Sequence, residues 1–223
     1  MWKILVKLLK TGIAGFDEFV GGGLPEGNTI LLLGEAGIGN LTFACHIAYN
    51  RVLEGKPVTY VLVGKSIVEV ERELEAFNWK IQQYVDKGLW KFLEKFDDIE
   101  KFTVLVEEME EGSWLIFDSL SDILLVEKPI KVAEFLKKLS LYAKKFGGLH
   151  FFVLDKGMFK PRVEALIQHF VDGVIVFDFE VRGMAAIRYF VVKKMVGKVI
   201  PQDLIVFSMN ENGIIVETAT RIT

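Results

Sequence analysis

The sequence of 223 residues has little of the chemistry that metal and disulfide sites need. It holds one Cys and three His, so no internal disulfide and no four-thiolate metal site can form, and no metal ligand is predicted. An excess of one charge is also missing, because 27 Lys and Arg face 30 Asp and Glu, a formal net charge of -3. Nucleic-acid binding by charge alone is therefore not expected, although a local basic patch stays open.

Long apolar runs are absent as well. Residues 1–10 interrupt their apolar stretch with a Lys every few positions, are too short for a spanning helix and lack a small-residue cleavage site. They are predicted to form a first strand, and the default expectation is a cytoplasmic protein. Hydrophobic residues reach 51%, enough for a sizeable core, and plentiful Glu and Lys with scarce Gln are typical of thermophiles.

Strand and helix patterns alternate along most of the chain. Apolar runs predict strands at 29–33, 58–63, 114–117 and 149–154, and helical patterns fall at 40–54, 66–77, 130–146 and 162–170. Short helices around a strand near 90–93 are expected between 79 and 111. Further strands are predicted at 174–179, 187–194, 204–209 and 214–217. This order predicts one α/β domain over 1–223, with a mostly parallel central sheet flanked by helices and antiparallel strands at its C-terminal end.

A glycine-rich loop at 34–42 separates the first buried strand from the first long helix. The phosphate-binding loop has Gly, four residues, Gly, Lys, then Ser or Thr, and here Asn40 and Leu41 stand in the last two positions. Thr42 is no simple substitute, because one residue along a helix turns the side chain by about 100°. Glycines and a helix N-terminus still favour an anion. A phosphate site without its cation and a glycine turn that packs a helix on a sheet both stay open.

Several segments, in the right order, resemble KaiC-like members of the RecA superfamily of ATPases. They are 11–18 (TGIAGFDE), 21–27 (GGGLPEG), 114–121 (WLIFDSLS), 170–175 (FVDGVI) and 194–197 (KMVG). The resemblance covers essentially the whole chain. It implies a RecA-like sheet, and a nucleotide bound between neighbouring subunits of a ring or filament.

The sequence departs from that family at four chemical roles. Asn40 and Leu41 replace the Lys for the outer phosphates and the Thr for the metal. Lys65 stands where the family has a carboxylate that activates water, and Val196 replaces an Arg that reaches a neighbour's phosphates. The resemblance therefore implies slow or absent ATP hydrolysis, because phosphoryl transfer depends on positioning and charge stabilisation.

The candidate nucleotide site combines the loop with the positions that the resemblance assigns. No catalytic residue is predicted. For the ligand three alternatives stay open: no cofactor, ATP or ADP, or a phosphate or sulfate anion at the loop. Lys65 is either a solvated loop side chain or a replacement for the cation missing at Asn40. Asp118 is expected to accept from loop N–H groups. The full set is Gly34, Gly37, Gly39, Asn40, Leu41, Thr42, Lys65, Asp118 and Lys194.

Three functions remain open from the sequence. The first is a degenerate KaiC-like domain that has lost ATP hydrolysis and acts as a binding or assembly module. The second is a working but unusual ATPase in which Lys65 and Asp118 cover the losses. The third is a RecA-type accessory of DNA recombination, which the acidic balance and the short segment 155–161 disfavour. The expected partner is a second copy of the chain or an intact KaiC-like paralogue, with no membrane, and nucleic acid is disfavoured as a partner.

Overall fold

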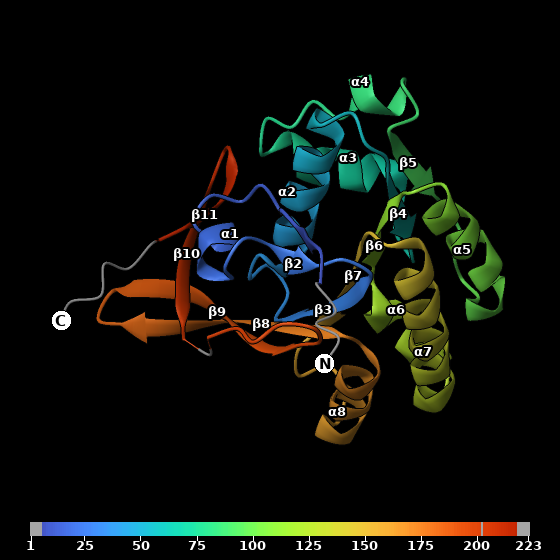
Figure 1. The fold of residues 1–223 in the computed structure, drawn as a ribbon. Coiled ribbons are helices and arrows are strands. Elements are labelled where there is room, and N and C mark those ends of the chain that lie inside the picture. The colour runs from blue at the N-terminus through green and yellow to red at the C-terminus, as the bar shows by residue number, and fades with distance from the viewer. Residues whose placement is uncertain (1–5, 202, 218–223) are drawn as a thin grey trace, which may run out of the picture.

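A nine-stranded sheet forms the centre of the structure, a computed structural model that describes residues 6–201 and 203–217 (Figure 1). Its strands are β3 (Asn28–Gly34), β4 (Val58–Leu62), β5 (Trp90–Leu93), β6 (Trp114–Asp118), β7 (Leu149–Asp155), β8 (Gly173–Arg182), β9 (Ala185–Met195), β10 (Ile205–Asn210) and β11 (Gly213–Val216). They lie in the order β11-β10-β9-β8-β3-β7-β6-β4-β5. From β8 to β5 neighbouring strands pair in parallel, whereas β9, β10 and β11 pair antiparallel. The predicted fold is confirmed.

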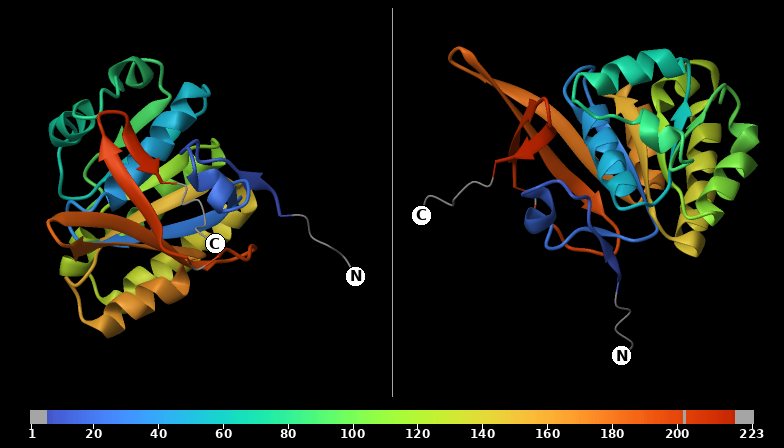
Figure 2. Two further views of the ribbon diagram at one scale, coloured as in Figure 1. Left: turned by 90° about the vertical axis from the view of Figure 1, so that its left-hand side faces the viewer. Right: turned by 90° about the horizontal axis from the view of Figure 1, so that it is seen from above.

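Helices cover both faces of this sheet (Figure 2). They are α1 (Phe16–Phe19), α2 (Asn40–Leu53), α3 (Ile67–Glu75), α4 (Gln82–Val85), α5 (Phe102–Glu110), α6 (Leu120–Val126), α7 (Pro129–Phe146) and α8 (Pro161–Phe170), with a 3-10 turn at Ile99–Lys101. Because successive strand side chains point to opposite faces, Ile30 and Leu32 pack on the side of α2, and Leu31 and Leu33 on the side of α7. Burial on both faces explains why the central strands are continuous apolar runs.

The local signals in the sequence set most element boundaries. At the start of α3 the Ser66 N–H donates to Glu69 Oε2 at 2.8 Å, and the Glu69 N–H donates to Ser66 Oγ at 3.4 Å. This is the predicted capping arrangement. Proline opens α7 and α8 at the first helical position, where its missing N–H costs nothing. Helix α6 was not predicted from the sequence.

The predicted first strand over residues 1–10 is present in part among the residues that the structure describes, and residues 1–5 lie outside them. Of residues 6–10, Leu8–Leu9 form a short strand (β1), which pairs with Leu24–Pro25 (β2) in a separate two-stranded sheet and not with the main sheet. Gly12, with a φ of 76°, then turns the chain soon after β1.

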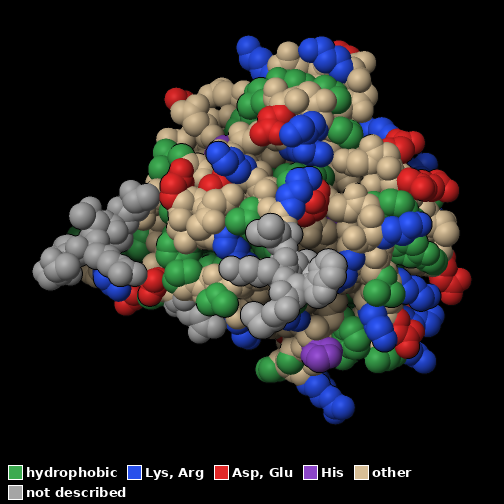
Figure 3. Space-filling model, viewed as in Figure 1, with side chains coloured by type: hydrophobic (Ala, Val, Ile, Leu, Met, Phe, Trp, Pro, Cys, Tyr) green, Lys and Arg blue, Asp and Glu red, His purple; other side chains and the backbone are tan. Residues whose placement is uncertain are grey.

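The surface carries mixed charge. Acidic and basic side chains are interspersed over the face drawn in Figure 3, in keeping with the nearly balanced composition. Within residues 6–201 and 203–217, none of the helices has the length and apolar character that crossing a bilayer requires.

Candidate functional site

A cavity of about 660 Å³ lies at the carboxyl ends of β3, β4, β6 and β7. Ligands in open parallel sheets bind at this edge, because loops from several strands meet there. The cavity gathers seven residues of the predicted set, Gly37, Gly39, Asn40, Leu41, Thr42, Lys65 and Asp118. Gly34 is the last residue of β3, directly before the loop.

The glycines of the loop serve its backbone and its packing together. Gly37 and Gly39 have φ values of 79° and 114°, which other residues rarely adopt. A Cβ on Gly39 would lie 2.8 Å from Met209 Sδ and 3.2 Å from the Phe207 ring, both on β10. The glycine at this position therefore lets the C-terminal hairpin pack against the loop, a role that needs no phosphate.

The loop keeps backbone donors and has no cationic side chain. The first N–H groups of α2 have no acceptor within the helix, so they remain suited to an anion. Asn40 is buried, and its Nδ2 is turned back to donate to the Leu32 carbonyl at 3.4 Å. Leu41 and Thr42 line the cavity without adding charge. The segment would hold an anion by its backbone alone.

Lys65 forms an ion pair with Asp118 inside this cavity. Its Nζ lies 2.9 Å from Asp118 Oδ2 and 3.7 Å from Glu73 Oε1. Burial would lower the pKa of Lys65, but the Asp118 carboxylate outweighs it, and the net pKa is raised above the ordinary value. Lys65 is thus charged, held by a carboxylate and only 31% exposed, which differs from a freely solvated lysine.

Tyr60 is a member of the site that the sequence did not single out. Its hydroxyl donates to the same Asp118 Oδ2 at 2.6 Å from the neighbouring strand β4. Burial, together with nearby negative groups that include Asp118, raises the pKa of Tyr60 well above its usual value. Asp118 therefore accepts from a phenol and an ammonium, in place of the loop N–H groups expected from the sequence.

Further carboxylates make the cavity acidic. Glu73, Asp122 and Asp155 line it together with Asp118, so four carboxylates face the one ammonium of Lys65. Ser119 Oγ donates to Asp122 Oδ2 at 2.6 Å, which holds one of these acids in place. Asp155 had a signal in the sequence, because it directly follows a buried apolar run as Asp118 does.

The side chains of this cavity supply few of the contacts that a magnesium-bound triphosphate uses. Residue 40 carries no ammonium and residue 41 no hydroxyl, and the lining has an excess of three negative charges, which repels a phosphate that arrives without a cation. Among the residues that the structure describes, no three or more His, Cys, Asp or Glu are grouped as metal ligands, although Mg²⁺ bound with a nucleotide needs fewer protein ligands than that. The backbone of the loop suits an anion, and the cationic side chain in the lining, Lys65, is paired with Asp118.

Lys194 lies apart from the rest of the predicted set. Its Nζ donates to the carbonyl oxygens of Gln168 at 3.2 Å, His169 at 3.0 Å and Val171 at 2.5 Å, at the end of α8. On the sheet it pairs with Val174, which lies beside Leu31 of β3. Three residues of β3 separate that level from Gly34, roughly 10 Å at the usual rise of a strand. Lys194 stabilises a helix end in its own chain and does not face the cavity.

Comparison with known proteins gives consistent matches over nearly the whole chain. A family model described as "ATPase: KaiC" matches residues 9–221. A UPF0273 protein of Pyrococcus furiosus is 27% identical over 237 residues, covering 95% of this chain and 94% of that protein. The circadian clock oscillator protein KaiC of Parathermosynechococcus lividus is 32% identical over 96 residues, 43% of this chain and 18% of its own length. A crystal structure of a KaiC-like protein from the hyperthermophilic archaeon Pyrococcus horikoshii matches with a TM-score of 0.84 and 27% identity, covering 95% of this chain and 99% of the other.

Proposed function

The chain belongs to the KaiC family of ATPase domains, and we propose that within this family it has lost ATP hydrolysis and acts as a binding or assembly module. The observation that carries the proposal is the ion pair between Lys65 Nζ and Asp118 Oδ2 at 2.9 Å. The resemblance assigns Asp118 to the second nucleotide motif and assigns the position of Lys65 to a water-activating carboxylate. Here the two side chains neutralise each other.

The losses reinforce one another. Without a cation at residue 40 or a hydroxyl at residue 41, no side chain on the loop offsets the phosphate charge, and Lys65 is committed to Asp118. General base catalysis contributes about 10²–10⁴-fold to a rate, and no carboxylate stands at position 65 to supply it. The absence of both the charge stabilisation and the general base supports the proposal that this site does not hydrolyse ATP.

The loss of hydrolysis is tested by measuring phosphate release in the presence of excess Mg²⁺ and ATP. Calorimetry with and without Mg²⁺ measures nucleotide binding in parallel. We expect no increase of phosphate with time, and weak or absent nucleotide binding. A turnover of about 1 s⁻¹ or faster that is abolished by Asp118→Ala would refute the proposal, since that is an ordinary enzymatic rate.

The assembly role rests on the side-by-side association that the family resemblance implies. Val196 replaces the Arg that would bridge to a neighbour's nucleotide, and Lys194 is occupied by three carbonyl groups of its own chain. Contact with a second copy or with an intact KaiC-like paralogue is therefore expected to be independent of ATP. Light scattering at micromolar concentration, with and without ATP, measures association of the chain with itself. If the protein is strictly monomeric, the paralogue remains as the expected partner, and a pull-down from the native organism must then recover it.

The second candidate is an unusual ATPase that uses Lys65 and Asp118. It is favoured by the open cavity of about 660 Å³ beside a loop of intact glycine spacing. If Lys65 serves a phosphate, Lys65→Ala weakens nucleotide binding by about tenfold to a hundredfold, the value of one charge-assisted contact. Unchanged nucleotide affinity in that variant would leave Lys65 as the partner of Asp118 only.

A further inference from the structure

A second cavity, which we call the basal cavity, lies at the opposite edge of the sheet. It has a volume of about 350 Å³ and opens beside the amino ends of β4, β6 and β7. Its lining residues come from the end of α2, the end of α7 and the turns before these strands. Those that matter here are Lys7, Glu26, Arg51, Lys56, Trp114 and Phe146.

Arg51 is the central polar group of the basal cavity. Its guanidinium carbon lies 4.3 Å from the centre of the Trp114 ring, so the planar cation rests on the indole. Its Nη2 donates to the Gly112 carbonyl at a long 3.4 Å, and its Nε is buried without an acceptor among the described residues. Burial lowers the pKa of Arg51 against the opposing effect of Glu54 and Glu26, so this charge is incompletely solvated. Because Nε is enclosed, the donors that Arg51 has left to offer to a ligand are N–H groups of its two Nη atoms.

The two lysines of the basal cavity differ from Arg51 in having carboxylate partners. Lys7 Nζ lies 2.8 Å from Glu26 Oε1, and Lys56 Nζ lies 2.7 Å from Glu54 Oε2. No described carboxylate forms an ion pair with Arg51. The lining thus holds three cations and one carboxylate, and the uncompensated cation is the least exposed of the three.

The remaining walls of the basal cavity are apolar and flat. The ring of Phe146 contributes aromatic surface, whereas the indole of Trp114 is nearly buried beneath the Arg51 guanidinium. Gly148 approaches this indole so closely that a Cβ there would lie 3.1 Å from Trp114. Ligand sites commonly combine such walls with a few polar groups, over volumes from about 300 to 1,000 Å³. At the lower end of that range, the cavity suits a molecule with one ring.

We propose that the basal cavity binds a small organic anion, with one carboxylate or phosphate group that pairs with Arg51 and a flat apolar part that lies against Phe146. The planar fork of a guanidinium matches both oxyanions in geometry, which a lysine does not. The site is separate from the acidic cavity, and it does not depend on the fate of ATP hydrolysis.

Phenyl phosphate is the probe, with benzyl alcohol as its uncharged analogue and inorganic phosphate as the anion without a ring. Binding is followed by the indole N–H signal of Trp114 in NMR spectra, assigned with Trp114→Phe. We expect a saturable shift with phenyl phosphate, a weaker response to inorganic phosphate and none to benzyl alcohol. Equal shifts with phenyl phosphate and benzyl alcohol, or no saturable shift with phenyl phosphate, would overturn the proposal.

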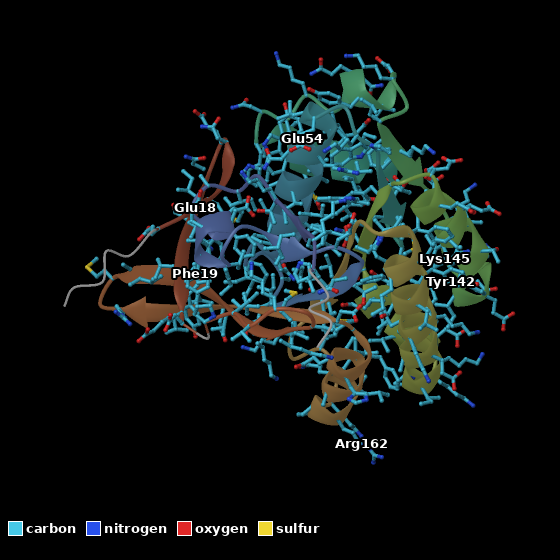
Figure 4. All side chains as sticks on the ribbon, viewed as in Figure 1. Glu18, Phe19, Glu54, Tyr142, Lys145 and Arg162 are labelled. Atoms are coloured by element: carbon cyan, nitrogen blue, oxygen red, sulfur yellow. The ribbon has the colours of Figure 1, made fainter. Side chains whose placement is uncertain are left out.

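Substitutions then test the assigned cation. Arg51→Gln is expected to weaken phenyl phosphate binding by about tenfold to a hundredfold, as for a charge-assisted hydrogen bond. The matched control is Arg162→Gln, an exposed arginine at the outer end of α8 that points away from the molecule in Figure 4. It should leave the affinity unchanged. An Arg51→Gln protein that folds and binds as tightly as the wild type contradicts the assignment.

Circular dichroism shows whether Arg51→Gln folds. If it does not, a third variant still tests the proposal. Lys56 is exposed, so Lys56→Gln preserves the core. It should weaken binding by about twofold to fivefold, as for an exposed charge at the rim. Added salt should weaken binding in the wild type more than in Lys56→Gln. Identical affinities in the two proteins, together with phenyl phosphate binding that added salt does not weaken in the wild type, would refute an anion site here.

Discussion

Two buried aspartates, Asp118 and Asp172, are each paired with a lysine at opposite edges of the same sheet, and their surroundings differ. Asp172 Oδ2 accepts from the N–H and hydroxyl of Thr29 at 3.1 and 2.8 Å and from Ser140 Oγ at 2.9 Å. Its Oδ1 accepts from Lys144 Nζ at 2.6 Å. Asp118 accepts from Tyr60 and Lys65 on Oδ2 alone. The first carboxylate is saturated and the second is not.

The difference separates a carboxylate that ties packed elements together from one that borders the candidate site. Asp172 ties the start of β8 to β3 and to α7, and every donor around it comes from packed elements. Asp118 borders a cavity, and no donor within the described part of the chain is assigned to its Oδ1. A Lys–Asp pair is therefore not diagnostic by itself, whereas an unsaturated carboxylate oxygen that borders a cavity is an acceptor that a ligand can reach.

The largest effect is expected for Asp172→Ala. The substitution leaves several buried hydrogen-bond donors without their acceptor, and it should lower the free energy of unfolding by about 3–5 kcal/mol. Chemical denaturation measures the loss. The control is Asp97→Ala, whose carboxylate pairs with Lys101 at the exposed surface and should leave stability unchanged. A loss under about 1 kcal/mol for Asp172→Ala would remove the distinction drawn here.

Asp118→Ala should cost less, about 1–3 kcal/mol, because the main penalty is one buried hydroxyl left without its acceptor. Lys65 is partly exposed and lies near Glu73, so its charge finds another partner. The same denaturation series gives the value. If Asp118→Ala lowers the free energy of unfolding as much as Asp172→Ala does, the two aspartates contribute equally to stability.

Tyr60→Phe separates the two partners of Asp118. It removes the phenol donor and leaves Lys65, so the free energy of unfolding should fall by about 0.5–1.5 kcal/mol, the net value of one hydrogen bond. If stability instead falls as far as in Asp118→Ala, the phenol and not the lysine is the main partner of the carboxylate.

The smallest effect is the pH dependence of Asp172. Burial would raise its pKa, but the hydrogen bonds from Lys144, Thr29 and Ser140 outweigh it, and the pKa is lowered. A lowered folded pKa stabilises the protein above the ordinary value of about 3.9, and that stability is lost as the pH falls further. Unfolding free energies measured below about pH 4 should fall less steeply in Asp172→Asn than in the wild type. Parallel curves would contradict the assignment.

The sequence by itself determined the elements and the missing chemistry. Apolar periods of two and 3.6 residues are local properties, so the strands of the main sheet, the longer helices and the cap at Ser66 followed from neighbouring residues, whereas α6 did not. The absence of a cation at Asn40 and of a hydroxyl at Leu41 is likewise a matter of identity at a fixed spacing. What local pattern did not determine was the place of the N-terminal strand, because pairing partners and not propensity decide where an edge segment goes.

Only the tertiary structure decided what those residues touch. Tyr60 reaches Asp118 because β4 lies beside β6, and this strand order arises from burying both faces of the sheet at once. The same order places Lys65 on Asp118 and puts Lys194 at a helix end away from the cavity. Arg51 meets Trp114 across 63 residues of sequence, where no spacing rule applies. Contacts between distant residues depend on register and strand order, which the packing of the whole core sets.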